Sequence, residues 1–135
     1  MQEIAKQLQS FLGPQGCLDD PNDIAAYASD LLALKTVAPV CVVRPATTAQ
    51  VASIMQYARK NKLAIIPQGG HTGLSGGAVA LNGGNSVILS LDRMTAIREI
   101  DTHDNVMIVE AGAVLADVQT AAREAGRIFP LSHGG

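Results

Sequence analysis

The stretch VCVVRPATTAQVASIMQYARKNKLAII, residues 40–66, contains two apolar runs separated by a longer segment with helical spacing. Residues 40–43 are apolar and mostly β-branched, and Arg44-Pro45 ends the run, which predicts a short strand buried on both faces. Residues 63–66 form a second apolar run of the same kind. Strand, helix and strand in this order predict a βαβ unit, in which two parallel strands belong to one sheet.

The segment between the two runs carries the signals of a helix. Thr47 and Gln50 have the spacing of a capping box, in which each side chain satisfies a backbone N–H at the helix start. The basic residues of 59–62 suit the negative end of the helix dipole. Apolar side chains recur between these ends at helical spacing, and they predict the buried face: Val51, Ile54, Met55 and Ala58.

Two more helices are expected before this unit. Gly13-Pro14 ends the first, and Asp20-Pro21 begins the second, with aspartate as cap and proline in the first turn. We treat residues 1–36 as an N-terminal helical segment. The apolar positions at helical spacing are Ile4, Leu8, Phe11 and Leu12 in the first helix, and Ile24, Tyr27, Ala28 and Leu31 in the second.

Further strands and one more helix are predicted after residue 80. Residues 86–91 predict a third strand, and residues 97–101 and 106–110 predict a hairpin around a turn rich in polar side chains. A last helix is expected from Val114 to Ala125, closed by Gly126, before a short strand at residues 127–130. The predicted fold class is α+β around the βαβ core.

Composition excludes several classes of protein. The chain of 135 residues is 47% hydrophobic, so it can bury a core without disulfides or metal. A net charge of −2 without a basic run argues against nucleic acid as a partner. Cys17 and Cys41 have no metal or redox spacing, which fits a reducing compartment. With neither a secretion signal nor a membrane-spanning apolar stretch, a cytoplasmic protein is expected.

The stretch PQGGHTGLSGGAV, residues 67–79, follows the second strand of the unit and holds five glycines: Gly69, Gly70, Gly73, Gly76 and Gly77. Glycine lets backbone N–H groups approach an anion, and ligands bind where such strands end. Thr72 and Ser75 add hydroxyl donors, while no Lys or Arg is present. These features favour a diphosphate held by amides. The alternative is that the glycines only let two backbones pack.

Two common phosphate motifs are absent. The P-loop requires Gly-Lys, and this dipeptide does not occur in the chain. The dinucleotide fingerprint requires glycines at positions i, i+2 and i+5, and the five glycines of the loop do not supply this spacing. A different class of nucleotide site is therefore expected.

The stretch VVRPATTAQVASIMQYARKNKLAIIPQGGHTGLSGGAV resembles the first half of the FAD-binding domain of vanillyl-alcohol-oxidase (PCMH-type) FAD-linked oxidoreductases. SVILSLDRMTAIREID and VEAGAVLADVQTAAREAGRIFPL resemble later parts of it, so the similarity covers about residues 38–131 in order. Pro67-Gln68 and the Leu-Asp-Arg-Met segment look most like the branch that oxidises D-2-hydroxy acids such as D-lactate, glycolate and D-2-hydroxyglutarate.

The resemblance implies that residues 37–135 are the first subdomain of such a domain, with the second subdomain and the substrate-binding cap absent. It implies FAD as cofactor and a small 2-hydroxy acid as substrate of the full-length protein. The chain by itself is then expected to be inactive and to bind FAD weakly or not at all. Truncation is expected to expose an apolar face that is available for oligomerisation. The implied cofactor-binding residues are Pro67, Gln68, Gly69, Gly70, His71, Thr72, Gly73, Leu74, Ser75, Gly76 and Gly77.

The resemblance leaves His71 with several readings. In some relatives a histidine at the matching place carries the flavin covalently, whereas in the D-2-hydroxy-acid branch the flavin is not covalently held. We expect a non-covalent hydrogen bond to FAD, with covalent attachment or a solvent-facing residue as alternatives. No catalytic residue and no metal ligand is assigned, and a strand-end salt bridge is expected for Arg44. The alternative function is an autonomous or relic nucleotide- or anion-binding module without redox activity.

Overall fold

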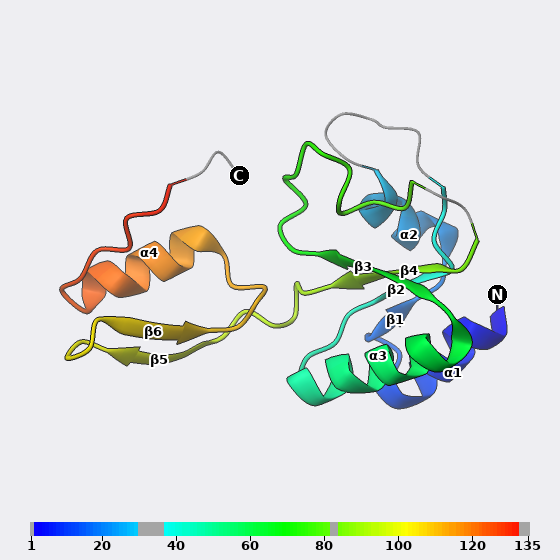
Figure 1. Cartoon of the computed structure of the whole chain (residues 1–135), viewed down its shortest axis with the longest axis horizontal. Coiled ribbons are helices and arrows are strands. Elements are labelled where there is room, and N and C mark those ends of the chain that lie inside the picture. Colours follow the sequence, from blue (N-terminus) through cyan, green and yellow to red (C-terminus); the bar gives the residue numbers. More distant parts are fainter. Residues whose placement is uncertain (1, 30–36, 82–83, 133–135) are drawn as a thin grey trace.

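The computed structural model describes residues 2–29, 37–81 and 84–132. Helices α1 and α3 lie on one side of a sheet and α2 on the other, while a strand pair with helix α4 forms a second unit beside them (Figure 1). The helices are α1 (Gln2–Leu12), α2 (Pro21–Ala28), α3 (Thr48–Asn61) and α4 (Leu115–Glu124). The strands are β1 (Cys17–Leu18), β2 (Cys41–Val43), β3 (Ala64–Gln68), β4 (Ser86–Ser90), β5 (Ile97–Asp101) and β6 (Val106–Val109).

The main sheet has the strand order β1-β2-β4-β3. Strands β2 and β3 both pair with β4 in parallel, and β1 pairs with β2 in the antiparallel direction. The predicted βαβ unit is therefore present as β2-α3-β3, and the α+β class is confirmed. Its two strands are not neighbours, however, because β4 is inserted between them. Strand β4 is buried along its whole length, as a central strand covered on both faces must be.

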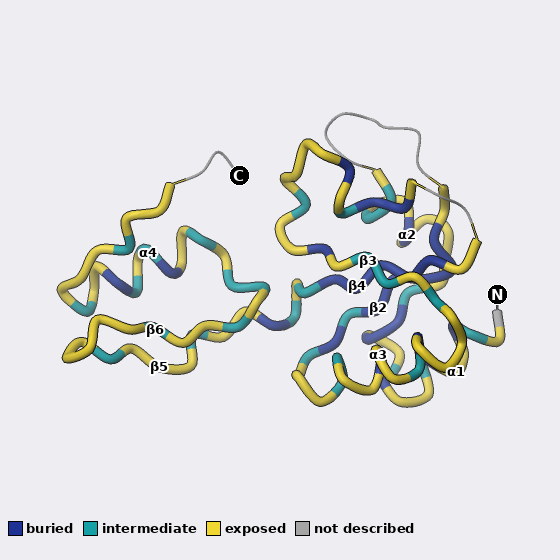
Figure 2. The backbone as a smooth tube through the Cα atoms, in the orientation of Figure 1, coloured by how far each residue is buried: buried dark blue, intermediate teal, exposed yellow. Residues whose placement is uncertain are grey.

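Alternate side chains of β2 and β4 pack against opposite helix layers. Cys41, Val43 and Leu89 belong to the core cluster that includes Leu8 of α1 and Ile54 of α3. On the other face Val42 and Ile88 pack with Ile24 of α2. Figure 2 shows this buried centre in dark blue, flanked by half-exposed helices. Because successive strand residues point to opposite faces, a short apolar run serves both layers.

Helix α3 begins as predicted, with one difference in its cap. Thr47 Oγ1 accepts a hydrogen bond from Gln50 N, but Gln50 Oε1 accepts from Ala46 N, one residue before the cap. Ile54 and Ala58 are buried. The expectation that Met55 is buried was wrong, since it is 48% exposed: it lies about 100° around the helix from Ile54 and faces solvent.

Helix α1 ends and helix α2 begins where predicted, while α2 ends at Ala28 and is shorter than expected. Asp20 Oδ1 caps α2 by accepting from Asn22 N at 2.8 Å, and Pro21 occupies the first turn. Phe11 of α1 is 38% exposed rather than buried and lies against Tyr57, with ring centroids 6.1 Å apart. Leu31, expected on the face of α2, lies outside the described residues.

The second unit is the antiparallel pair β5–β6, covered on one side by α4. Its turn contains Asn105 at φ 56°, and Gly126 at φ 69° follows the C-cap of α4 as predicted. The short strand expected at residues 127–130 is not formed: Pro130 cannot donate to a ladder, and among the described residues no strand lies alongside. Arg127 instead donates to Asn105 Oδ1 and Thr102 O and so holds the end of α4 to the hairpin turn.

Strand β3 is longer than expected. It continues through Pro67 to Gln68, both of which were assigned to the glycine loop. A proline fits here because β3 is an edge strand of the sheet, where one side needs no ladder donor. Across the described ranges, we find no helix with the length and apolar composition required to span a membrane.

Candidate functional site

The three parallel strands end at one edge of the sheet. Arg44 follows β2, Gln68 is the last residue of β3, and Ser90 is the last residue of β4. The glycine loop, residues 69–77, leaves from this edge (Figure 1). Ligand sites in parallel sheets form outside the carboxyl ends of the strands, so the predicted loop occupies the expected place.

The glycines of the loop are not required by close packing. A Cβ atom built on Gly69, Gly70, Gly73 or Gly77 meets no atom within 4 Å beyond the neighbouring residues. The interpretation that these glycines only let two backbones pass closely is therefore wrong at these four positions. Their missing side chains leave open space over the backbone, as access for a ligand requires.

The N–H groups of the loop have no acceptor among the described residues. Within the described part of the chain, no N–H group from Gly69 to Gly77 donates a hydrogen bond. His71 and Gly76 have positive φ, of 58° and 71°, so the backbone has a left-handed conformation at both residues. Thr72 and Ser75 are exposed. Free N–H groups on a turning backbone are the elements of an anion-binding concavity.

Gln68 differs from the loop that follows it. Its side chain is only 2% exposed, and Nε2 donates to Ala78 O and to Tyr27 O, both at 2.9 Å. Its own carbonyl accepts from Leu91 N at 2.9 Å. The side chain thus joins both ends of the glycine loop to helix α2.

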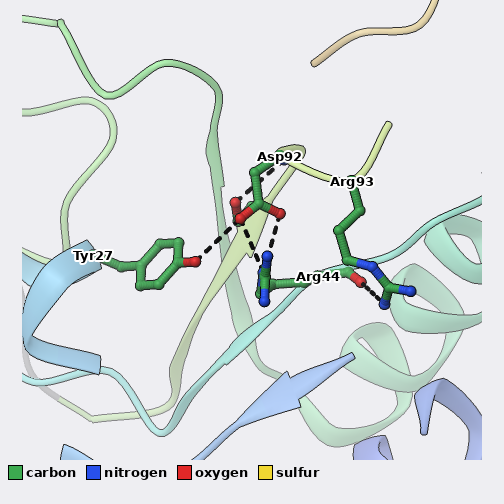
Figure 3. Close-up of polar contacts among 5 residues, drawn as sticks. Tyr27, Arg44, Asp92 and Arg93 are labelled. Carbon is green, nitrogen blue, oxygen red and sulfur yellow. Dashed lines mark hydrogen bonds and ion pairs between the residues drawn. The ribbon is translucent and has the colours of Figure 1, made fainter. Parts of the chain in front are cut away.

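A polar cluster lies at the same edge and is drawn in Figure 3. Arg44 Nε donates to Asp92 Oδ2 at 2.9 Å, and the Tyr27 hydroxyl donates to the same oxygen at 3.1 Å. Arg93 Nη1 donates to Arg44 O at 3.0 Å, and Asp92 N donates to Ser90 Oγ. The salt bridge expected for Arg44 is confirmed. Burial, together with the charge of Asp92 and the bond to it, raises the pKa of Tyr27.

Sequence reasoning did not assign Tyr27, Asp92 or Arg93 to this edge. Their contacts join residues that are 48 to 65 positions apart, and no local pattern signals them. The signal that exists is topological, since residues just after parallel strands meet at one edge.

His71 lies within the loop, half-buried, and its Nε2 atom is buried without a hydrogen-bond partner among the described residues. His103 is exposed in the hairpin turn. Over residues 2–29, 37–81 and 84–132 no group of three or more metal-ligating side chains comes together.

Residues 39–135 match the family described as FAD binding domain. The chain belongs to this family. It is 36% identical over 112 residues to D-2-hydroxyglutarate dehydrogenase of Xanthomonas citri pv. viticola, covering 83% of this chain and 23% of that protein. It is 34% identical over 128 residues to D-2-hydroxyglutarate dehydrogenase of Stutzerimonas stutzeri, and this match covers 95% of this chain and 27% of that protein. The chain thus spans about a quarter of the length of these relatives.

The same fold occurs in p-cresol methylhydroxylase, with a TM-score of 0.79, 22% identity and coverage of 93% of this chain and 25% of that structure. At this identity the likeness concerns the fold alone. Together with the family match, it confirms the resemblance to PCMH-type FAD-binding domains.

Proposed function

We propose that the glycine loop of this FAD-binding-domain chain binds the diphosphate of FAD. The observation that carries the proposal is the set of N–H groups from Gly69 to Gly77, which donate to no acceptor among the described residues. They follow strand β3 at the carboxyl edge of the sheet, and the backbone is open at Gly69, Gly70, Gly73 and Gly77. Anions bind to such groups without a cationic side chain. Arg44, a cation of the polar cluster, is paired with Asp92, and the proposed donors are the amides and the hydroxyls of Thr72 and Ser75.

The proposed roles differ along the predicted set. The glycines give the diphosphate access to the backbone, and the exposed hydroxyls and Leu74 line the approach. Pro67 and Gln68 belong to strand β3 and hold the loop at its start. All eleven residues from Pro67 to Gly77 remain candidates for the cofactor site. The division at residues 36 and 37 also remains a proposal, because residues 30–36 lie outside the described part.

The larger protein is proposed to oxidise a D-2-hydroxy acid to the 2-oxo acid. This rests on the names of the two relatives described above, both of which are D-2-hydroxyglutarate dehydrogenases. Bound FAD supplies the two-electron oxidation by accepting hydride from the substrate carbon. No catalytic residue is assigned to this chain, whose part is to bind and orient the cofactor. Cytoplasmic location and self-association through its exposed apolar surface remain predictions.

Non-covalent attachment is proposed for the flavin. Covalent attachment needs a ring nitrogen of His71 to reach the flavin, and in this structure one of its two ring nitrogens, Nε2, is buried. Acid precipitation of the flavin-loaded full-length protein tests this. The flavin is expected in the supernatant, and yellow colour retained in the precipitate would contradict non-covalent binding.

Chemical-shift mapping on the ¹⁵N-labelled chain tests the loop itself. ADP, which carries the diphosphate, is expected to shift the amide signals of residues 69–77 with weak affinity, and FAD is expected to shift the same signals. Adenosine lacks the diphosphate and is the matched control, so it is expected to leave these signals in place. Shifts confined to another part of the chain, or no shift with either nucleotide, would refute the proposal.

A further inference from the structure

Gln68 is the residue of the site whose contacts fit least well with direct cofactor binding. Its amide group is buried, with the side chain 2% exposed, and Nε2 uses both of its N–H groups on backbone carbonyls. A side-chain amide has only two donors. Gln68 therefore has no donor left for a phosphate, although it directly precedes the loop.

The two carbonyls lie at informative places. Ala78 follows the loop, so the bond from Gln68 joins the residues on either side of the loop 69–77. Tyr27 belongs to α2, on one face of the sheet. The side chain of Gln68 thus connects the two ends of the loop with each other and with helix α2.

Tyr27 connects Gln68 with the polar cluster. Tyr27 accepts from Gln68 with its carbonyl and donates to Asp92 with its hydroxyl, and Asp92 is paired with Arg44 at the end of β2. The ends of β2, β3 and β4 are connected in this way through one residue of α2. The two hydrogen bonds of Gln68 restrict the conformation of a buried side chain, because breaking them leaves its polar group unsatisfied.

The glycine loop needs a contact outside itself to keep one conformation. It contains five glycines in nine positions, and glycine loses more conformational freedom on ordering than any other residue. Among the described residues its N–H groups make no hydrogen bonds that could order it from within. We propose that Gln68 is a positioning residue, whose amide holds the glycine loop closed so that the backbone N–H groups face one anion. This inference rests on the proposed function of the loop.

Two substitutions test the role of the donors. Gln68→Met keeps the length of the side chain and removes both N–H groups. Gln68→Glu also removes them at neutral pH, but the protonated carboxyl group has one O–H donor and restores one of the two bonds. Gln56→Glu is the matched control, because Gln56 is exposed on α3.

The first measurement needs no ligand. Heteronuclear ¹⁵N relaxation of residues 69–77 reports their order, and both Gln68 variants are expected to lose it while the sheet signals stay unchanged. Lowering the pH from about 7.5 to 5 is expected to restore order partly in Gln68→Glu only, since burial raises the pKa of an introduced carboxyl group. Wild type and Gln68→Met, which contain His71 and the other titratable groups of the chain but no carboxyl group at position 68, are the controls for this change of pH. Tyr27, Arg44 and Asp92, the charged or titratable residues of the neighbouring polar cluster, are the same in all of these variants.

The second measurement is the ADP titration by amide shifts. The apparent affinity of Gln68→Met for ADP is expected to fall about tenfold or more, as for a site whose competent state is seldom populated. Unchanged loop order or unchanged affinity in Gln68→Met would overturn the assignment. Loss of the whole folded spectrum would also overturn it, because Gln68 would then hold the fold and not the loop. If wild type does not bind ADP, the proposed function is wrong. The relaxation data still show in that case whether Gln68 orders residues 69–77.

Discussion

Tyr27 donates its hydroxyl to the carboxylate of Asp92 at 3.1 Å, across 65 residues of chain. The same carboxylate accepts from Arg44 Nε at 2.9 Å. Helix α2 and the segments that follow β2 and β4 therefore meet at a single charged side chain (Figure 3). The edge of the sheet next to the glycine loop is held by this contact.

Replacing Asp92 tests its contribution to stability. Asp92→Asn removes the ion pair with Arg44, and because both side chains are about a third exposed we expect a loss of about 1 kcal/mol in unfolding free energy. Urea denaturation measures it, and about 1 M salt should shrink the difference. Asp104→Asn, at an exposed turn position, is the control. Equal midpoints for the two variants would show that the cluster does not stabilise the fold.

The hydroxyl of Tyr27 makes stability depend on alkaline pH. Its pKa is raised from 10.0 by burial and by Asp92, so the folded state favours the protonated form. The stabilisation is complete below about pH 10 and is lost as the pH rises through the raised value. In a Tyr57→Phe background, which leaves one tyrosine, absorbance titration should show tyrosinate forming later in the folded than in the unfolded chain. Coincident curves would contradict the bond to Asp92.

Glu110 makes the stability of the folded chain depend on acidic pH, in the direction opposite to Tyr27. Its pKa is lowered by the hydrogen bond from Arg98 Nη2 at 2.8 Å and by the bond from Ala96 N. A lowered pKa stabilises the folded chain above the usual carboxyl range, and this contribution is lost as the pH falls through the shifted value. Glu110→Gln should therefore differ most from wild type near neutral pH and least in strong acid. Thermal melts across the acid range measure this, with Glu99→Gln as an exposed control.

Gly112 is required for a different reason from the loop glycines. A Cβ atom there would collide with the backbone carbonyl of Leu91, and Gly112 N donates to Met94 O at 2.9 Å. Backbone on both sides cannot yield easily, so Gly112→Ala is expected to cost about 3 kcal/mol. Gly69→Ala, which meets nothing, should be nearly neutral for stability. Denaturant titration of both variants decides, and equal stability would contradict the close contact.

The two cysteines should be inert in the folded chain. Cys17 and Cys41 are 2% and 0% exposed, and Cys17 Sγ lies 3.6 Å from Ala5 O. The hydrogen bond with Cys17 and burial both raise the pKa of the Cys41 thiol. An aromatic disulfide reagent is expected to label neither thiol under native conditions and both after unfolding. Rapid native labelling would show that the layer under α1 opens.

Local sequence patterns predicted most of the elements, because their signals are local. The cap at Asp20, the apolar run of β2 and Gly126 after α4 each depend on a few adjacent residues. The expected strand at residues 127–130 failed for a non-local reason, since a strand needs a partner and apolar composition cannot provide one.

Only the part of the site that has a local sequence signal was predicted. The glycine pattern located the loop, and the resemblance connected it with FAD. The role of Gln68 and the Tyr27–Asp92 contact depend on which strand ends lie together. That placement follows from the insertion of β4, which spacing along the chain does not reveal.

Strand β4 has a consequence for the order in which the chain can fold. It is the last strand of the main sheet in sequence and lies at its centre, where both β2 and β3 hydrogen-bond to it. On a ribosome, β2, α3 and β3 emerge before their common partner exists. Such non-local pairing is slow, and it leaves strand edges exposed until the centre arrives. Nascent chains that end before Ser90 are therefore the ones in which chaperone binding and misassociation should be strongest.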